Sequence, residues 1–401
     1  MNNSVANRLI TIDTINTLGT AITWTGLPIF ALHLTGSYIY TGSLYLTGTI
    51  AGIITTILSG HFIDKGSSKK IMATAFALNS LVMIMLFSFI SVGQFLFLFP
   101  IMIISQSLGS FADLCLDVWY RDITEKDKNL DLAKSISKKN TYTMSCKTIG
   151  FTLGPLIFSL LNSYAIIMEA ITFLISCIIT IRMKTSHQID TQNNNAEWFS
   201  IRYLVNIIKD STLLNFLFTY ALGGMIGPVV ISLSIYTLES HFEVNDSLIS
   251  LFWLIGGLGV IISNILLTKS NLLSLSKLTL YLLSLALISG GIIIMGVSSN
   301  PIYYIIGFSL MTFGNPIINT LLSAQAFKAI PQNSKAKIMG VMEASSEIGT
   351  LLFMAISWLL ISYSGIFFTL MIIAFLATIR ISIFYSSFFE VILRSDKSVK
   401  S

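Results

Sequence analysis

The sequence predicts an all-α membrane protein with twelve transmembrane helices in two pseudo-symmetric six-helix halves. Three observations predict this fold class. Apolar residues make up 54% and charged residues 11% of the 401 positions, and the mean hydropathy is +0.79, whereas soluble chains carry about 25% charged residues. Many windows of roughly 20 residues, the length an α-helix needs to cross a bilayer, contain at most one charge. Lys and Arg are confined to alternate links between these apolar windows.

The apolar runs define the individual spans. Strands of a membrane barrel would alternate apolar and polar residues, and these runs do not alternate. We therefore expect helices at 8–32, 38–62, 71–91, 95–118, 139–162, 164–183, 211–237, 246–267, 277–297, 301–327, 338–362 and 364–389.

The basic residues predict the orientation of the chain. If the N-terminus is cytoplasmic, no outside link contains Lys or Arg and nearly all 24 bases lie inside, as the positive-inside bias requires. We therefore expect a multi-pass monomer in the inner (cytoplasmic) membrane of a bacterium, with both termini in the cytoplasm. Because the bases are spread over alternate loops, the net charge of +5 predicts no nucleic-acid partner.

The longest polar interval between spans divides six spans from six. We interpret this interval, 184–210, as a flexible cytoplasmic linker. The predicted domains are a first half at 1–183, the linker at 184–210, a second half at 211–390 and a cytoplasmic tail at 391–401.

A weak internal repeat relates the two halves. An offset of 204 residues aligns the second span of each half and places Ser43-Leu44 on Ser247-Leu248, together with three further positions. The further aligned pairs are Gly52 with Gly256, Gly60 with Asn264, and Lys65 with Lys269. Such duplication is typical of many secondary transporters.

A polar cluster separates the second span from the third. Its members are Gly60, Asp64, Lys65, Lys69 and Lys70. Gly60 allows close helix approach, and Asp64 can lie at the N-terminus of a neighbouring helix and pair with bases. Alternatively, the cluster is a solvated loop that only fixes orientation. The second half has Thr268 where Asp64 stands in the first.

Six plus six spans, a long central loop and this Gly-x-x-x-Asp-Lys cluster resemble the major facilitator superfamily over almost the whole chain. The superfamily's usual motif has a second glycine three residues after the aspartate. Here Gly66 comes two residues after Asp64, and two serines precede Lys69 and Lys70. That spacing is similar to the macrolide, siderophore and drug exporter branch. The resemblance implies the major facilitator fold, alternating access, and a conformational latch formed by the polar cluster.

A second motif lies in the fifth span. Gly150, Gly154 and Pro155 are similar to the Gly-x-x-x-Gly-Pro segment of drug-exporting members, and small residues four apart allow close helix packing. Two departures weaken the inference of antiport. The glycine pair that follows is replaced by Phe158 and Ser159, and Gln106 stands where exporters often carry arginine.

Charged residues within the spans are candidates for function, because each costs several kcal/mol unless it is paired or hydrated. The candidates for proton coupling are Asp13, Asp113, Asp117, Lys147, Glu343, Glu347 and Arg380. Spans one and four line the central cavity in the superfamily, which favours Asp13 and Asp113. Glu169, near the outer end of span six, reads as an interfacial acid and is not selected.

Alternatives stay open for several of these charges. Similar depth suggests a pair between Asp113 and Lys147, and Asp117 could form an ordinary ion pair at the Trp119-Tyr120-Arg121 interface. The three charges of the second half, Glu343, Glu347 and Arg380, could form a purely structural tie.

The resemblance also nominates residues of the substrate cavity. They are Asn16, Trp24, Gln106, Asn215, Tyr220, Asn315 and Asn319, in spans one, four, seven and ten. Each aromatic could instead be a packing residue. The sequence Gly314-Asn315-Pro316 predicts a break in the tenth helix, which would expose backbone carbonyls to a bound group.

Motifs of catalysis are missing from the sequence. It contains no phosphate loop, zinc helix or nucleophile elbow, and its three cysteines lack metal-ligand spacing. We therefore expect no enzyme activity, no cofactor and no metal site.

The predicted function is proton-coupled export, by antiport, of a small amphipathic compound such as a drug, a self-made antibiotic of peptide or other type, or a siderophore. Efflux of this kind confers antibiotic resistance on the cell. The expected partners are the small-molecule substrate, protons and the lipid bilayer. Uptake by proton symport is one alternative. A non-transporting sensor or assembly factor is the alternative of another class.

Overall fold

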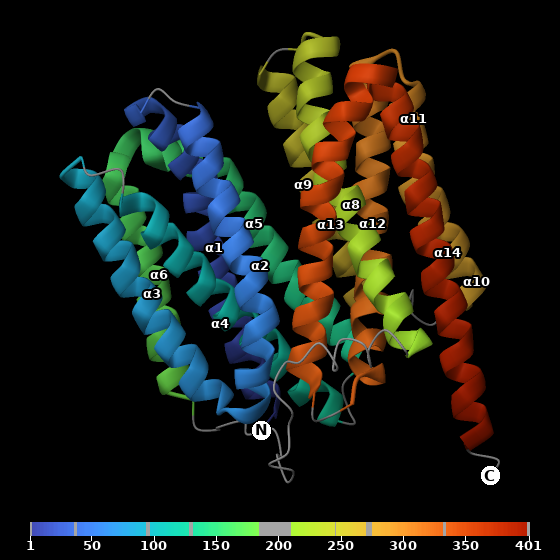
Figure 1. Ribbon diagram of the computed structural model, residues 1–401. Coiled ribbons are helices and arrows are strands. Elements are labelled where there is room, and N and C mark those ends of the chain that lie inside the picture. Colours follow the sequence, from blue (N-terminus) through green and yellow to red (C-terminus); the bar gives the residue numbers. More distant parts are fainter. Residues whose placement is uncertain are drawn as a thin grey trace. The chain divides into compact units, whose positions relative to one another are not determined.

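The computed structural model describes residues 2–35, 38–93, 97–127, 131–183, 210–244, 246–269, 275–331 and 334–398. The regular elements within these ranges are all helical (Figure 1). The first group comprises α1 (Asn2–Thr35), α2 (Tyr38–Lys65), α3 (Ser68–Ser91), α4 (Leu98–Lys126), α5 (Leu132–Leu161), η2 (Asn162–Tyr164) and α6 (Ala165–Ile181). The second comprises α8 (Ser211–Tyr236), η3 (Thr237–His241), α9 (Asp246–Lys269), α10 (Lys277–Ser284), η5 (Leu285–Ser289), α11 (Gly290–Val297), α12 (Pro301–Ala329), α13 (Lys335–Ser364) and α14 (Ile366–Ser398).

The helices confirm the all-α class, and each predicted span overlaps a helix. Several helices are longer than the apolar runs that predicted them. α4 ends at Lys126 rather than 118, and α5 begins at Leu132 rather than 139. Lys, Glu and Arg are good helix formers, so a helix continues where hydropathy has already fallen.

Ten stretches of the described residues are long and apolar enough to cross a membrane. α1 is not among them, and α5 contributes only its last residues, from Leu156, to a stretch that continues through α6. Four lysines lower the hydropathy of α5: Lys134, Lys138, Lys139 and Lys147. The chain is thus a multi-pass membrane protein by composition, and the count of twelve spans stays a prediction.

The chain forms two compact units. Unit 1 contains Met1–Leu132, Tyr142–Phe199 and Pro331–Val341, and unit 2 contains Ala133–Thr141, Ser200–Ile330 and Met342–Ser401. The first turns of α13 therefore belong to unit 1 and its remainder to unit 2. The predicted domains are continuous in sequence, and their boundaries stay a prediction.

The predicted linker lies outside the described residues, except for its last residue. Asp210 caps α8, since its carboxylate accepts hydrogen bonds from the backbone N–H groups of Thr212 and Leu213, at 2.9 and 3.3 Å. Most of the predicted tail is helical, because α14 continues to Ser398.

Unit 1 is built from helix pairs that pack along their length. α3 packs against α4 and α6, α2 packs against α4, and α1 packs against α6 (Figure 1). Phe76 of α3 and Phe173 of α6 stack in its core with ring centroids 6.3 Å apart. Gly52 of α2 faces Ser110 of α4.

Unit 2 repeats some of these pairings with other residues. α9 packs against α12, and α8 packs against α14. Phe252 of α9 stacks on Phe308 of α12 at 4.0 Å between centroids. Gly256, which the internal repeat aligns with Gly52, faces Phe308. The two aligned glycines therefore lie at comparable helix contacts in their units.

The predicted break in the tenth span is wrong. α12 continues through Gly314, Asn315 and Pro316 without interruption. A proline inside a helix removes one backbone donor, and neighbouring helices can compensate for that loss in a membrane protein. Gly314 also packs closely against Ile288 of η5, which supports the helix at this point.

The two glycines of the fifth span lie at a tight contact with α1. A Cβ atom at position 150 would lie 3.1 Å from the carbonyl oxygen of Leu18, and one at position 154 would lie 2.7 Å from that of Ile22. The backbones of α1 and α5 approach so closely because neither glycine has a side chain. The structure does not describe the side chain of Pro155.

We expect Gly154→Ala to destabilise the protein, because the new methyl group would contact a backbone oxygen that cannot move away easily. Overpacking of this kind costs about 1–3 kcal/mol. The measurement is the melting temperature of the purified protein in detergent. Gly290→Ala is the matched control, since no heavy atom lies within 4 Å of its added methyl group. Equal melting of the two variants would contradict the tight contact.

Candidate functional site

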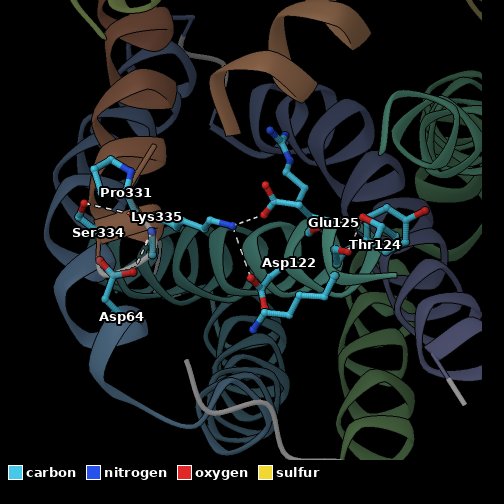
Figure 2. Close-up of polar contacts among 11 residues, drawn as sticks. Asp64, Asp122, Thr124, Glu125, Pro331, Ser334 and Lys335 are labelled. Atoms are coloured by element: carbon cyan, nitrogen blue, oxygen red, sulfur yellow. Dashed lines mark hydrogen bonds and ion pairs between the residues drawn. The ribbon is translucent and has the colours of Figure 1, made fainter. Parts of the chain in front are cut away.

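The carboxylate of Asp64 lies at the N-terminus of α13. Its Oδ1 accepts a hydrogen bond from the backbone N–H of Ala336 at 2.9 Å, and its Oδ2 accepts one from Lys337 at 3.1 Å (Figure 2). The side chain is 1% exposed. The first N–H groups of a helix have no partner within the helix, and a negative charge there is favourable. Asp64 therefore caps α13 from α2.

Two glycines allow α2 and α13 to come this close. A Cβ atom at position 60 would lie 2.5 Å from the Cα atom of Lys337, and one at position 340 would lie 2.5 Å from the carbonyl oxygen of Thr56. Side chains at either position would separate the helices. The close approach that the sequence assigned to Gly60 thus places Asp64 within reach of the backbone of α13.

The lysines of the polar cluster make other contacts. Lys69 donates to the carbonyl oxygen of Met183 at 2.5 Å, just beyond the end of α6, while Lys65 and Lys70 are exposed. Within the described part of the chain, Asp64 forms no ion pair with any of the three. Its hydrogen-bond partners are backbone groups, and the charge of Lys337 on α13 interacts with it.

A buried ion-pair group lies beside this contact. Lys335, the first residue of α13, reaches Asp122 at 3.5 Å and also Glu125 (Figure 2). Lys126 pairs with Asp122 at 2.9 Å. Lys335 is 1% exposed and Asp122 2% exposed. Pairing offsets part of the free-energy cost of removing both charges from water. These residues were not among the predicted candidates, because the charged run after the fourth span predicts only the orientation of the chain.

The preferred proton carriers lie together in unit 1. Asp13 of α1 accepts a hydrogen bond from the hydroxyl of Thr143 at 2.8 Å. Asn16, one turn further along α1, donates to Asp113 of α4 at 3.1 Å. The side chain of Asp113 is exposed and that of Asp13 half-buried. Lys147 of α5 is close enough to Asp113 for their charges to interact.

Asp117 lies one turn beyond Asp113 on α4. It forms an ion pair of 2.5 Å with Arg121. This is the ordinary interfacial pair that the sequence left open as an alternative. The pair reduces the need for any further role of Asp117.

Two of the predicted substrate residues line one small cavity in unit 1. The cavity lies among α1, α3, α4 and α6 and has a volume of about 10 Å³. Its lining residues are Thr23, Trp24, Leu27, Met83, Met102, Gln106 and Glu169. Glu169, which the sequence analysis did not select, is its one acid.

Two others surround Arg380 in unit 2. Its Nη2 donates to Asn319 at 2.6 Å, and its Nε donates to the carbonyl oxygen of Thr219 at 3.1 Å. Arg380 is 5% exposed. Tyr220 lies within electrostatic range of the guanidinium, and its hydroxyl is 3.3 Å from that of Ser323.

The remaining predicted site residues lie on α8, α12 and α13. Asn215 of α8 and Asn315 of α12 are half-buried. Glu343 and Glu347 lie on α13, and their predicted tie to Arg380 stays a prediction. No group of three or more His, Cys, Asp or Glu side chains that could hold a metal ion occurs in the described ranges.

Solved structures share this fold at low sequence identity. One is a bacterial homologue of the iron transporter ferroportin in an outward-facing state, with 14% identity, a TM-score of 0.77, and coverage of 96% of this chain and 99% of that one. The fucose:proton symporter of E. coli has 11% identity, a TM-score of 0.78, and coverage of 96% and 99%. The human organic anion transporter MFSD10 (TETRAN) has 12% identity, a TM-score of 0.68, and coverage of 94% and 99%.

Comparisons of the sequence itself are decisive for the family. No curated protein matches the chain. The sequence profile of the Major Facilitator Superfamily matches residues 9–354, which is most of the chain and includes Asp13, Asp64, Asp113 and Lys335. Together with the helical fold and the capped N-terminus of α13, this match shows that the chain belongs to the Major Facilitator Superfamily.

Proposed function

We propose that this protein exports a small amphipathic compound from the cytoplasm by proton-coupled antiport. The observation that carries the proposal is the cluster of Asp13, Asp113, Asn16 and Lys147 in unit 1. Two acids held by hydrogen bonds on adjacent membrane helices, one of them exposed, can bind and release protons as their surroundings change. The substrate would be a drug, an antibiotic made by the same cell, or a siderophore.

The architecture we propose is that of two six-helix halves with twelve spans, acting as a monomer in a bacterial inner membrane with both termini in the cytoplasm. Alternating access then requires a contact that is made in one state and lost in another. The capping of α13 by Asp64 suits this role, because the cap joins α2 to the end of a helix whose remainder belongs to unit 2. We assign the latch to Gly60, Asp64 and the first turn of α13.

The direction of transport is proposed from the sequence of the polar cluster. The two-residue spacing between Asp64 and Gly66 resembles that of the exporter branch. Gln106 departs from that branch, and it lines a cavity together with Glu169. An acid beside Gln106 suggests that this chain couples protons through carboxylates where related exporters use arginine.

Purified protein in lipid vesicles with an imposed pH gradient tests the proposal. We expect accumulation of at least one compound from a panel that contains a macrolide, a hydroxamate siderophore and a cationic dye, with movement opposite to that of protons. Movement in the same direction as protons would show symport and uptake. Failure of every compound to respond to the gradient in either direction would support a non-transporting role and reject the proposal.

A further inference from the structure

Glu169 is a carboxyl group buried inside unit 1. It lies four residues after the start of α6 and is 3% exposed. The cavity beside it is lined from α1, α3 and α4 as well as α6. Since all four helices surround the carboxyl group, it points into the unit and not toward lipid.

The hydrogen-bonding capacity of this carboxyl group is not filled. The hydroxyls of Thr20 and Thr23 lie beside it, yet its Oε2 atom and the Thr23 hydroxyl oxygen each lack a hydrogen bond of normal geometry. A buried ionised carboxylate with one oxygen unsatisfied is very unfavourable in such a place. The group must therefore take up a proton or a hydrogen-bonding molecule.

The cavity limits what that ligand can be. Its volume of about 10 Å³ is at the lower limit for one water molecule, so no organic substrate fits in this conformation. Four of its seven lining residues are apolar or aromatic: Trp24, Leu27, Met83 and Met102. The oxygen atoms left are those of Thr23, Gln106 and Glu169, fewer than the six to eight oxygens that a calcium ion takes. A proton carried by one water molecule matches both the volume of the cavity and the small number of oxygen atoms that line it.

No other charge interferes with this group among the side chains the structure describes. None of the other cavity residues ionises in the physiological range. The charged side chains described on the three packed helices lie toward the opposite end of each: Arg8 and Asp13 on α1, Lys69 and Lys70 on α3, and Asp113, Asp117, Arg121, Asp122, Glu125 and Lys126 on α4. The ionisation of Glu169 therefore responds mainly to hydration and to the distance between α1 and α6.

The lining residues of the cavity differ in exposure. Trp24 and Gln106 are its two half-buried lining residues, and the other five are buried. Small movements of these two side chains would admit water to Oε2. Close packing of α1 on α6, where a Cβ atom at Gly19 would contact Thr172, makes the spacing around Glu169 sensitive to any shift of α1.

We infer that Glu169, with Thr23 and Gln106, forms a second proton-binding site in unit 1, separate from Asp13 and Asp113. A hydronium ion in the cavity transfers its proton to Oε2, which leaves a neutral carboxyl group and one water molecule, and the reverse transfer releases the proton. Thr23 lies ten residues beyond Asp13, or about 15 Å along α1 at 1.5 Å per residue. α1 thus contributes a residue to each site, Asp13 to the proposed one and Thr23 to that of Glu169, at different depths. Proton binding at Glu169 stands on its own, whereas its use in transport rests on the proposed function.

Infrared titration of the purified protein in lipid nanodiscs tests the site without any substrate. We expect a band of a protonated carboxyl group that appears and disappears with pH, is lost in Glu169→Gln, and persists in Glu243→Gln, a matched change at an exposed carboxyl group. Thr23→Val keeps the carboxyl group and should shift both the midpoint of the pH titration and the frequency of the same band. This variant tests the site if Glu169→Gln does not fold.

The outcomes separate this inference from the proposed function. Persistence of the band in Asp113→Asn, together with loss of proton-driven transport there, would leave both standing. An unchanged spectrum in Glu169→Gln, or no titration of this band at any pH at which the protein is folded, would overturn the inference. Displacement of the band by sodium at constant pH would also overturn it in favour of a metal cation site.

Discussion

Asp113→Asn is expected to reduce proton-driven flux to the level of protein-free vesicles. Asparagine has the shape of aspartate but cannot bind and release a proton, so the variant separates proton exchange from structure. Its amide oxygen can still accept the hydrogen bond from Asn16, now 3.1 Å long. Lys147 would lose a nearby negative charge, but its Nζ also lies over the ring of Phe151, 5.5 Å from the centroid. We therefore expect the variant to fold.

The measurement is uptake of a responsive compound into vesicles, with and without a pH gradient, at equal amounts of folded protein. Asp117→Asn is the informative comparison, because Asp117 is one turn away and already paired with Arg121. That variant should keep most of the gradient-driven flux. If Asp113→Asn transports as well as the unchanged protein, Asp113 has no part in coupling, and Asp13 becomes the remaining carrier of the proposed site.

The helices could be predicted because they depend on the hydropathy of continuous stretches of the sequence. A run such as 71–91 is apolar enough to require a helix in lipid, and α3 occupies Ser68–Ser91. The position of Asp64 at a helix N-terminus could also be predicted from the sequence. An acid at the end of a membrane helix, four residues after a glycine, has few places for its charge, and a helix N-terminus is one of them.

The partners of most charges could not be predicted, because they are set by contacts between segments far apart in sequence. Depth in the membrane suggested that Arg380 meets Glu347, but depth does not give the face of the helix. In the structure, Arg380 turns to Asn319 and to the backbone of Thr219. Lys335 meets Asp122 across 213 positions, and no local pattern indicates this pair.

Glu169 shows a different limit of sequence reasoning. Near the end of an apolar run, an acid is most simply explained by contact with lipid headgroups or water. Only the packing of α1, α3 and α4 around it shows that the carboxyl group is enclosed. The threonines at 20 and 23 of α1 were visible in the sequence, but nothing in the sequence pairs them with α6.

Asp64→Ala is expected to release the N-terminus of α13 from α2. The substitution removes both acceptors of the backbone N–H groups of Ala336 and Lys337, and each buried donor left without a partner costs roughly 1–3 kcal/mol. Since about 1.4 kcal/mol is a tenfold change in an equilibrium, the population in which this contact is open should rise at least about tenfold. If the contact is a latch, transport should become uncoupled or slow while the rest of the chain stays folded.

Labelling of a cysteine placed at Thr56 measures this opening. Thr56 is 5% exposed, and its backbone lies against Gly340 of α13, so a maleimide should react only after α13 has moved away. The half-buried Cys146 is replaced by serine to lower the background. Asp64→Asn, which keeps one neutral acceptor, should label at an intermediate rate, and Glu243→Ala, at an exposed acid outside unit 1, should label like the parent.

Faster labelling in Asp64→Ala with an unchanged melting temperature would show local opening of the contact. Equal labelling rates in all variants would mean that the cap stabilises α13 without controlling access, and the cluster from Gly60 to Lys70 would then be a structural element and not a latch.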